Sequence, residues 1–93
     1  MTRIAEMNFE DRLNSLGLIL PEATAPAGNY VPFVHAGDMV YISGQISNGP
    51  DGLVLGKLGD NMDVEAGAAA AQLCGLHLIA QLKAACGGDL GRL

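Results

Sequence analysis

The longest regular pattern in the sequence lies at residues 63–86, where an Ala- and Gly-rich segment predicts one long helix. Asp63 can cap its N-terminus and Glu65 suits the first turn, because acidic side chains are stabilised at the positive end of a helix dipole. The polar stripe is narrow and contains Glu65, Gln72 and Lys83. Since most of the circumference is apolar, we expect neighbouring structure to cover this helix on most sides, and its small residues would permit close packing on a sheet.

Upstream of this helix, two apolar runs flank a short turn that contains glycine, which is typical of a β-hairpin. They predict strands at about residues 30–35 and 39–46, and a turn signal at 48–52 leads into a third strand at about 53–55. Pro32 has no backbone N–H, so the first strand should be an edge strand or should pair only outside that position. The sequence therefore predicts a small meander on which the long helix packs.

The two ends of the chain complete an α+β pattern. At the N-terminus, residues 8–16 predict a short amphipathic helix with Asn8 as its cap. At the other end, Leu90 and Leu93 have the character of the opening of a fourth strand, so we expect an unfinished sheet and a polypeptide that ends in mid-fold. A length of 93 residues allows one domain, which we take as residues 1–93.

The charge of the chain argues against a polyanionic partner. Its formal net charge is −5 and its five Lys and Arg residues are scattered, whereas nucleic-acid binding depends on clustered cations. The N-terminal residues lack the apolar core of a signal peptide, and the most apolar stretch, residues 66–82, is short for a membrane span and contains polar side chains. We therefore expect a soluble cytoplasmic protein with neither a nucleic-acid nor a membrane partner.

The two cysteines, Cys74 and Cys86, both lie on the predicted long helix. A helix rises about 1.5 Å per residue, so the two side chains are about 18 Å apart, which is beyond disulfide reach. We interpret them as small core residues of a reducing compartment. With no Cys-x-x-Cys motif and no nearby pair of histidines, the sequence gives no support for a metal site.

Several patterns that are typical of catalytic sites fail on closer inspection. The glycines around the third predicted strand have three residues between them, whereas a phosphate-binding loop needs four, and a Ser or Thr after its Lys. A triad of Ser43, His35 and Asp38 would need a geometry that a hairpin does not readily give. His77, within the long helix, is better explained as a hydrogen-bonded core or interface residue than as a catalyst.

The second predicted strand changes character at Ser43-Gly44-Gln45. One interpretation is a strand end with a bulge, where glycine interrupts packing and the polar pair meets solvent. The other is a ligand site, in which Gly44 allows a ligand to approach the backbone while Ser43 offers a hydroxyl beside it. The residues of this stretch alone leave both interpretations open.

A longer pattern around this stretch resembles a known family. The segment "PAGNYVPFVHAGDMVYISGQI" is similar to the N-terminal signature of the RidA family, also called YjgF or L-PSP proteins: Pro and Gly before a Tyr, a short strand, a Gly-containing turn, and a strand that ends in Ser-Gly-Gln. The G-x-L-x-x-G pattern that follows and the Ala-rich helix also resemble the family. The leading "EDRLNSLGLILP" is similar to a longer branch with an extra N-terminal helix, so the resemblance covers nearly the whole chain.

The resemblance implies a chorismate-mutase-like α+β fold, in which helices pack on one face of a mixed sheet. It also implies a homotrimer with a pocket at each interface between subunits. Proteins that resemble RidA hydrolyse reactive enamines and imines, such as 2-aminoacrylate, to 2-keto acids and ammonia without a cofactor. By position, Ser43 and Tyr30 match catalytic residues of the family pocket, and Tyr30, Ser43 and Gly44 match residues that contact the substrate.

The family's carboxylate-binding arginine and a later acidic residue would lie beyond Leu93, so the resemblance implies that this chain lacks the C-terminal third of the fold. Arg92 comes before the strand that bears the family arginine and does not replace it. Three alternatives to enamine and imine hydrolysis remain open. They are a trimer that binds small carboxylates without turnover, a fragment without activity, and an endoribonuclease or translation inhibitor. The last is a label that the family also carries, and the negative charge disfavours it.

Overall fold

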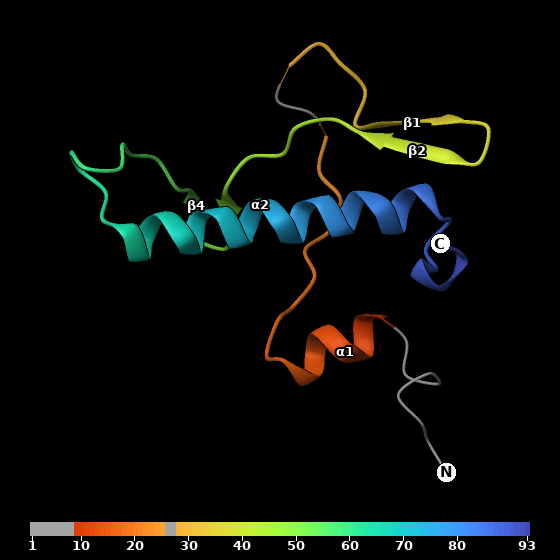
Figure 1. Ribbon diagram of the computed structural model, residues 1–93, viewed down its shortest axis with the longest axis horizontal. Coiled ribbons are helices and arrows are strands. Elements are labelled where there is room, and N and C mark those ends of the chain that lie inside the picture. The colour runs from red at the N-terminus through yellow and green to blue at the C-terminus, as the bar shows by residue number, and fades with distance from the viewer. Residues whose placement is uncertain (1–8, 26–27) are drawn as a thin grey trace.

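The computed structural model describes residues 9–25 and 28–93 of the chain. Its elements are, in order, α1 (Phe9–Ser15), β1 (Phe33–Ala36), β2 (Met39–Ile42), β3 (Asn48–Gly49), β4 (Gly52–Leu53), α2 (Val64–Ala85) and a 3₁₀ helix, η2 (Leu90–Arg92). Helix α2 forms the long axis of the molecule, with the β1–β2 hairpin along its C-terminal half and α1 on the other side (Figure 1). The combination of helices with antiparallel hairpins confirms the predicted α+β class.

The β1–β2 hairpin is shorter at its open end than the sequence predicted. Regular pairing stops at Phe33 and Ile42, whereas we expected strands that reach back to residue 30 and on to residue 46. The cause is Pro32. Its carbonyl accepts a hydrogen bond from the Ser43 N–H at 3.0 Å, but Pro32 has no N–H of its own with which to continue the ladder.

One face of this hairpin packs on α2 and the other faces outward. Burial alternates along β2, where Val40 and Ile42 are half-buried while Met39 and Tyr41 are exposed. Because side chains of a strand point alternately to its two faces, the half-buried residues lie on the side of α2 and the exposed residues form an apolar outer face. Val34, which pairs with Tyr41, is exposed as well.

The region of the predicted third strand is a second, very short hairpin. Asn48 pairs with Leu53 and Gly49 with Gly52, so the strand begins before residue 53 and ends at it, rather than spanning 53–55. Ser47 and Val54 extend the pairing irregularly, since the Val54 N–H donates to the Ser47 carbonyl at 2.9 Å and the Ser47 hydroxyl donates to the Val54 carbonyl at 2.8 Å. The two hairpins are separate sheets rather than one meander.

Helix α2 begins where its cap was predicted, because Oδ1 of Asp63 accepts a hydrogen bond from the Ala66 N–H at 2.8 Å. The expectation that it is covered on most sides is wrong for the described residues. Its buried residues lie along one face: Leu76, His77, Ala80 and Gln81. Elsewhere on the helix the described residues are half-buried or exposed, and Val64 at the first turn is 80% exposed.

The predicted fourth strand near the C-terminus is also wrong. Residues Leu90–Arg92 form η2, which is capped by Asp89, whose Oδ1 accepts from the Gly91 N–H at 2.9 Å. Short acidic side chains form such local bonds and so favour a tight turn over an extended strand. Leu90 is buried, and η2 lies in contact with α1.

Helix α1 is tied to α2 by an ion pair between Glu10 and Lys83, with 2.7 Å between carboxylate oxygen and Nζ. The cap expected at Asn8 lies outside the described residues. Cys86 is buried and Cys74 is half-buried, and both are free thiols. In the described part of the chain, no helix combines the length and the apolar character that crossing a membrane requires.

Candidate functional site

Ser43 lies one residue beyond the end of β2 and is fixed by two hydrogen bonds to one acceptor. Its backbone N–H and its hydroxyl both donate to the Pro32 carbonyl, at 3.0 and 3.1 Å. Because the hydroxyl proton is directed to Pro32, the lone pairs of Oγ remain available to accept a hydrogen bond from a ligand or a water molecule. Ser43 is therefore a positioned acceptor.

Gly44 follows Ser43 and leaves its backbone open. A Cβ atom added at Gly44 would have no heavy atom within 4 Å. Among the described residues, none accepts a hydrogen bond from the Gly44 N–H. Ser43 and Gly44, which we call the Ser43–Gly44 site, thus present an acceptor and a donor side by side, which is the pairing that the sequence suggested.

A cavity of about 270 Å³ lies beside Ser43 and has the dimensions of a small organic molecule. We call it the Ser43 cavity. Its other lining residues are Val31, Phe33, Val34, Tyr41 and Ile42. This lining is apolar apart from Ser43 and the Tyr41 hydroxyl, and it carries no charged side chain, so the cavity by itself would favour a compact, weakly polar group.

Tyr30 lies at the same end of the hairpin, two residues before Pro32, but it does not line the Ser43 cavity. Its ring lies against Gly28, where an added Cβ would be 2.9 Å from Tyr30 Cε1. A side chain at position 28 would therefore displace the Tyr30 ring. The side chain is 47% exposed, so Tyr30 stands at the outside of the site rather than within it.

Ser43 lies far from His35 and Asp38, the other two residues of the triad considered above. His35 pairs with Val40, three residues along β2 from Ser43, which is about 10 Å of strand. Asp38 lies farther away, in the turn at the closed end of the hairpin. The ring of His35 contacts Phe33 edge-on, with 5.9 Å between ring centroids. A catalytic triad is therefore excluded on geometry.

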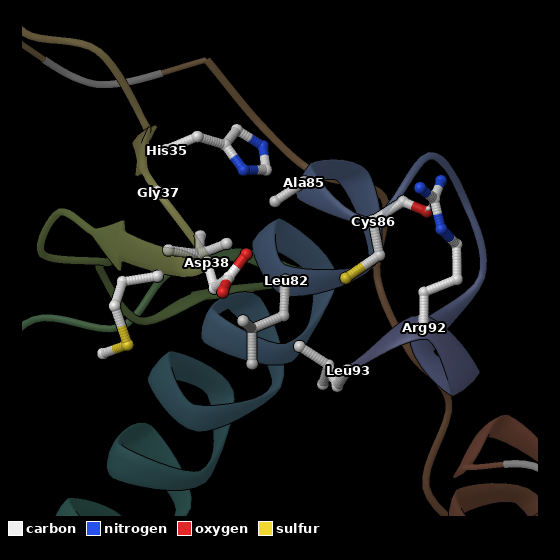
Figure 2. A pocket seen from close by; sticks show the side chains of 10 residues that line it. His35, Gly37, Asp38, Leu82, Ala85, Cys86, Arg92 and Leu93 are labelled. Carbon is white, nitrogen blue, oxygen red and sulfur yellow. Dashed lines mark hydrogen bonds between the residues drawn. The ribbon is translucent and has the colours of Figure 1, made fainter.

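His35 and Asp38 instead line a second cavity, of about 410 Å³, between the hairpin turn and the C-terminal end of α2. Figure 2 shows their side chains there together with those of Cys86 and Arg92. The Arg92 guanidinium donates from Nη1 to the Cys86 carbonyl at 3.2 Å. Arg92 thus compensates the negative end of α2, as a cation at a helix C-terminus does, and it lies away from the Ser43–Gly44 site.

His77 is 3% exposed and its Nε2 lies 2.7 Å from the Asn48 carbonyl. A carbonyl only accepts, so Nε2 carries a proton and joins α2 to the second hairpin. This supports the structural interpretation of His77. In the part of the chain that the structure describes, no cluster of three or more His, Cys, Asp or Glu side chains could hold a metal ion.

Two glutamines near the site were not identified from the sequence as functional. Gln81 is one of the polar side chains within the apolar stretch 66–82, and Gln45 belongs to the polar end of the second predicted strand. Gln81 is 1% exposed and lies 3.5 Å from Gln45 (Nε2 to Oε1). The signal that could have found Gln81 is an amide on the face of an otherwise apolar helix, because a buried amide requires a specific partner.

An α+β chain whose hairpin ends at Ser-Gly-Gln and packs on one Ala-rich helix is an arrangement of the chorismate-mutase-like class. Residues 10–93 match the family described as "YjgF/chorismate_mutase-like, putative endoribonuclease", and the chain belongs to this family. This agrees with the family resemblance and with the fold class inferred from the sequence.

Three individual proteins are similar to this chain. The chain is 40% identical over 94 residues to Protein TCP17 of Trypanosoma cruzi, with 100% of this chain and 58% of the relative covered. A crystal structure titled "putative endoribonuclease" from Shewanella oneidensis is similar with a TM-score of 0.80 and 44% identity over 89% of this chain and 55% of that one. A protein of unknown function from Agrobacterium tumefaciens has a TM-score of 0.73 and 41% identity over 87% of this chain and 48% of that one.

The chain thus spans about half the length of the relatives that it matches. The part that it shares with them contains both hairpins, α2 and the Ser43–Gly44 site.

Proposed function

We propose that the protein that contains this chain hydrolyses reactive enamines and imines of the 2-aminoacrylate type to 2-keto acids and ammonia. The observation that carries the proposal is the Ser43–Gly44 site. A hydroxyl whose proton is committed to Pro32 stands next to a backbone N–H that has no acceptor among the described residues, at the edge of a cavity of about 270 Å³.

The reaction does not need a strong acid or a strong base from the protein. The imine tautomer adds water across its C=N bond, the resulting carbinolamine loses ammonia, and a keto group remains. The substrate is already reactive, so binding its carboxylate, placing one water molecule and donating to the departing nitrogen would give a useful rate. In the proposal, the Gly44 N–H donates to a substrate oxygen and Ser43 Oγ accepts from the water or from the substrate N–H.

Tyr30 is proposed to complete this arrangement from the outside of the hairpin. Its hydroxyl makes no hydrogen bond with the described residues, and its side chain is half exposed beside the segment that supplies Pro32. A phenol hydroxyl is a hydrogen-bond donor, so it would donate to the substrate or to a water. Ser43 and Tyr30 therefore orient the reactants rather than drive proton transfer.

The substrate carboxylate needs a cation that the Ser43 cavity does not contain, since none of its lining residues is charged. We propose that the site is completed in a homotrimer, in which the outer face of the β1–β2 hairpin meets another copy. Val34, Met39 and Tyr41 on that face are 47%, 57% and 56% exposed, which is unusual for large apolar side chains gathered on one small sheet.

Binding without turnover is the second candidate. The Ser43–Gly44 site offers hydrogen-bonding groups but no carboxylate, imidazole or amine that could serve as a general base, so a site that binds a small carboxylate without turnover, with its cation supplied by another copy, is the alternative. Cleavage of RNA is disfavoured, because a chain with a net charge of −5 repels a phosphate backbone.

The test is to mix the purified full-length protein with freshly generated 2-aminoacrylate and to follow the release of pyruvate. We expect release faster than in buffer alone. A thermal shift on addition of pyruvate without any acceleration would favour the binding module. If neither acceleration nor a thermal shift occurs, both candidates are wrong. Retention of RNA by the protein in a parallel binding assay would then favour the endoribonuclease function.

A further inference from the structure

We infer that Gln81, a residue of α2, is a positioning residue for the Ser43–Gly44 site and acts on it through Gln45. The inference rests on the proposed function in one respect, namely that the Gly44 N–H faces the substrate. It goes beyond that proposal because it assigns a role to a buried side chain that contacts neither the Ser43 cavity nor a ligand.

Gln81 is 1% exposed. An amide in such a place is costly unless its polar atoms are hydrogen-bonded. Its Nε2 donates to the Thr24 carbonyl at 2.9 Å and lies 3.5 Å from Oε1 of Gln45, within reach of its second N–H. The first of these bonds is short and the second is long. Because Gln81 is almost fully buried, its second N–H has few competing acceptors from solvent.

Gln45 connects Gln81 to the Ser43–Gly44 site. Its Nε2 donates to the Ser43 carbonyl at 3.2 Å. The orientation of the Gln45 amide follows from its neighbours, since the Ser43 carbonyl can only accept and must face the nitrogen, which leaves the oxygen for Gln81. The three groups therefore form one directed series of hydrogen bonds, from the Gln81 amide to the Gln45 amide to the Ser43 carbonyl.

The Ser43 carbonyl and the Gly44 N–H belong to the same peptide group, which is planar and trans, so they point in opposite directions. When Gln45 holds the carbonyl on its own side, the Gly44 N–H is turned to the other side. Glycine has no side chain to restrict rotation of this peptide, so an external hydrogen bond is needed to fix its orientation. Gln81 supplies that restriction indirectly, by holding Gln45.

The same series connects the site to the N-terminal part of the chain. Thr24 lies in the segment that crosses from α1, at a sequence distance of 57 residues from Gln81, and Gln45 is 36 residues away. Gln81 thus lies where three distant segments meet on the buried face of α2, and Figure 1 shows the crossing segment passing α2 on its way from α1 to the hairpin.

The experiment compares Gln81→Met with Gln72→Met in the full-length protein. Methionine has a similar length to glutamine but no amide, and Gln72 is an exposed glutamine on the same helix, so it is the matched control. The Gly44 N–H would contact the substrate before and during reaction alike, so its misorientation weakens both states equally and raises KM with little change in kcat. For Gln81→Met we expect KM for 2-aminoacrylate to rise about tenfold, kcat to change little, and the Gly44 amide resonance to move.

A purely structural role would lower the melting temperature and the active fraction, and so the apparent kcat, while KM and the Gly44 resonance of the folded protein stayed as in wild type. That result would overturn the inference. Gln45→Met provides a second route if Gln81→Met does not fold, because it should reproduce the same rise in KM. The double variant should be no worse than either single one, whereas additive effects would show that the two residues act separately.

Failure of the proposed function is distinguishable from failure of the inference. If the wild-type protein does not hydrolyse 2-aminoacrylate, the enzyme proposal is wrong. The Gly44 resonance and the affinity for pyruvate still test the positioning role in the same variants. If Gln81→Met and Gln72→Met then give the same Gly44 resonance, the inference is wrong whatever the protein catalyses.

Discussion

The Ser43 hydroxyl and the Ser43 N–H both donate to the carbonyl oxygen of Pro32, at 3.1 and 3.0 Å. Pro32 has no N–H to donate to the Ser43 carbonyl, so the hydrogen-bond ladder of the β1–β2 hairpin ends here. The Pro32 carbonyl accepts both hydrogen bonds from Ser43. The strand becomes polar at this point for a structural reason, and the next residue, Gly44, is released from pairing. Pro32 is therefore the cause both of the end of the ladder and of the start of the Ser43–Gly44 site.

Ser43→Ala removes the hydroxyl but keeps the backbone bond to Pro32. We expect the free energy of unfolding to fall by about 0.5–1.5 kcal/mol, the usual contribution of one hydrogen bond. The rate of 2-aminoacrylate hydrolysis should fall by up to about tenfold, since one neutral acceptor is lost. Chemical denaturation and pyruvate release measure the two effects.

Ser47→Ala is the matched control for that variant, because the Ser47 hydroxyl donates to the Val54 carbonyl at 2.8 Å, away from the Ser43 cavity. It should cost a similar stability and leave the rate unchanged. If the two variants lose activity equally, the effect of Ser43→Ala comes from stability alone and Ser43 has no role in the reaction.

Gly44→Ala should separate folding from binding. Gly44 does not have a positive φ and an added Cβ meets nothing within 4 Å, so alanine fits the fold and should change the free energy of unfolding by less than about 1 kcal/mol. The methyl group would nevertheless occupy the open space through which a ligand approaches the backbone, so affinity for pyruvate should fall. Isothermal titration calorimetry measures this change.

Gly75→Ala serves as the control for that prediction, because an added Cβ at Gly75 also meets nothing within 4 Å. Gly75 lies within α2, where alanine is favoured over glycine by about 1 kcal/mol. This variant should therefore be more stable and bind pyruvate as wild type does. Unchanged pyruvate affinity in Gly44→Ala as well would contradict the placement of a ligand at Gly44.

His77→Leu tests whether His77 is structural. The substitution removes the part-buried hydrogen bond to the Asn48 carbonyl, so the free energy of unfolding should fall by about 0.5–1.5 kcal/mol. The activity per folded molecule should not change, since His77 does not line the Ser43 cavity. A stable variant that has lost its activity would show that His77 takes part in the chemistry.

Asp63→Ala removes the N-cap of α2, where Oδ1 accepts from the Ala66 N–H at 2.8 Å. We expect a loss of about 1 kcal/mol in the free energy of unfolding, whereas Asp63→Asn, which retains a capping oxygen, should lose much less. Thermal melts followed by circular dichroism compare the two variants. Equal losses would indicate that the charge of Asp63, rather than its hydrogen bond, stabilises the helix.

Local signals in the sequence predicted the features that depend on neighbouring residues. The cap at Asp63 and the glycine turn of the hairpin are set by the chemistry of adjacent positions, and both occur where expected. Pro32 was correctly expected to limit the pairing of the first strand. Its effect on the partner strand, which ends at Ile42, was missed because it requires knowledge of the register.

Features that depend on distant contacts were not predicted. The apolar circumference of α2 suggested that it is covered on most sides, but its buried residues lie along one face in the described chain. Leu90 has the composition of a strand residue, yet the local cap made by Asp89 holds it in η2. Composition reports how apolar a segment is, but not which neighbours it has.

The candidate site was predicted in part. The Ser-Gly-Gln stretch pointed to Ser43, which lines the Ser43 cavity, and to Gly44, which adjoins it. Gly44 and Tyr30, at the same end of the hairpin, do not line the cavity. The role inferred for Gln81 could not be predicted, because its partners are 57 and 36 residues away in sequence. A buried polar group is defined by its partners, and these are known only in three dimensions.

The most direct test of the Ser43–Gly44 site is a titration of the isotope-labelled full-length protein with pyruvate, followed at the backbone amide of Gly44 by nuclear magnetic resonance. Gly37, in the turn at the other end of the hairpin, is the internal reference. The account predicts a saturable shift of the Gly44 amide while that of Gly37 stays in place. A Gly44 amide that does not move at pyruvate concentrations that shift other residues of the protein would contradict it.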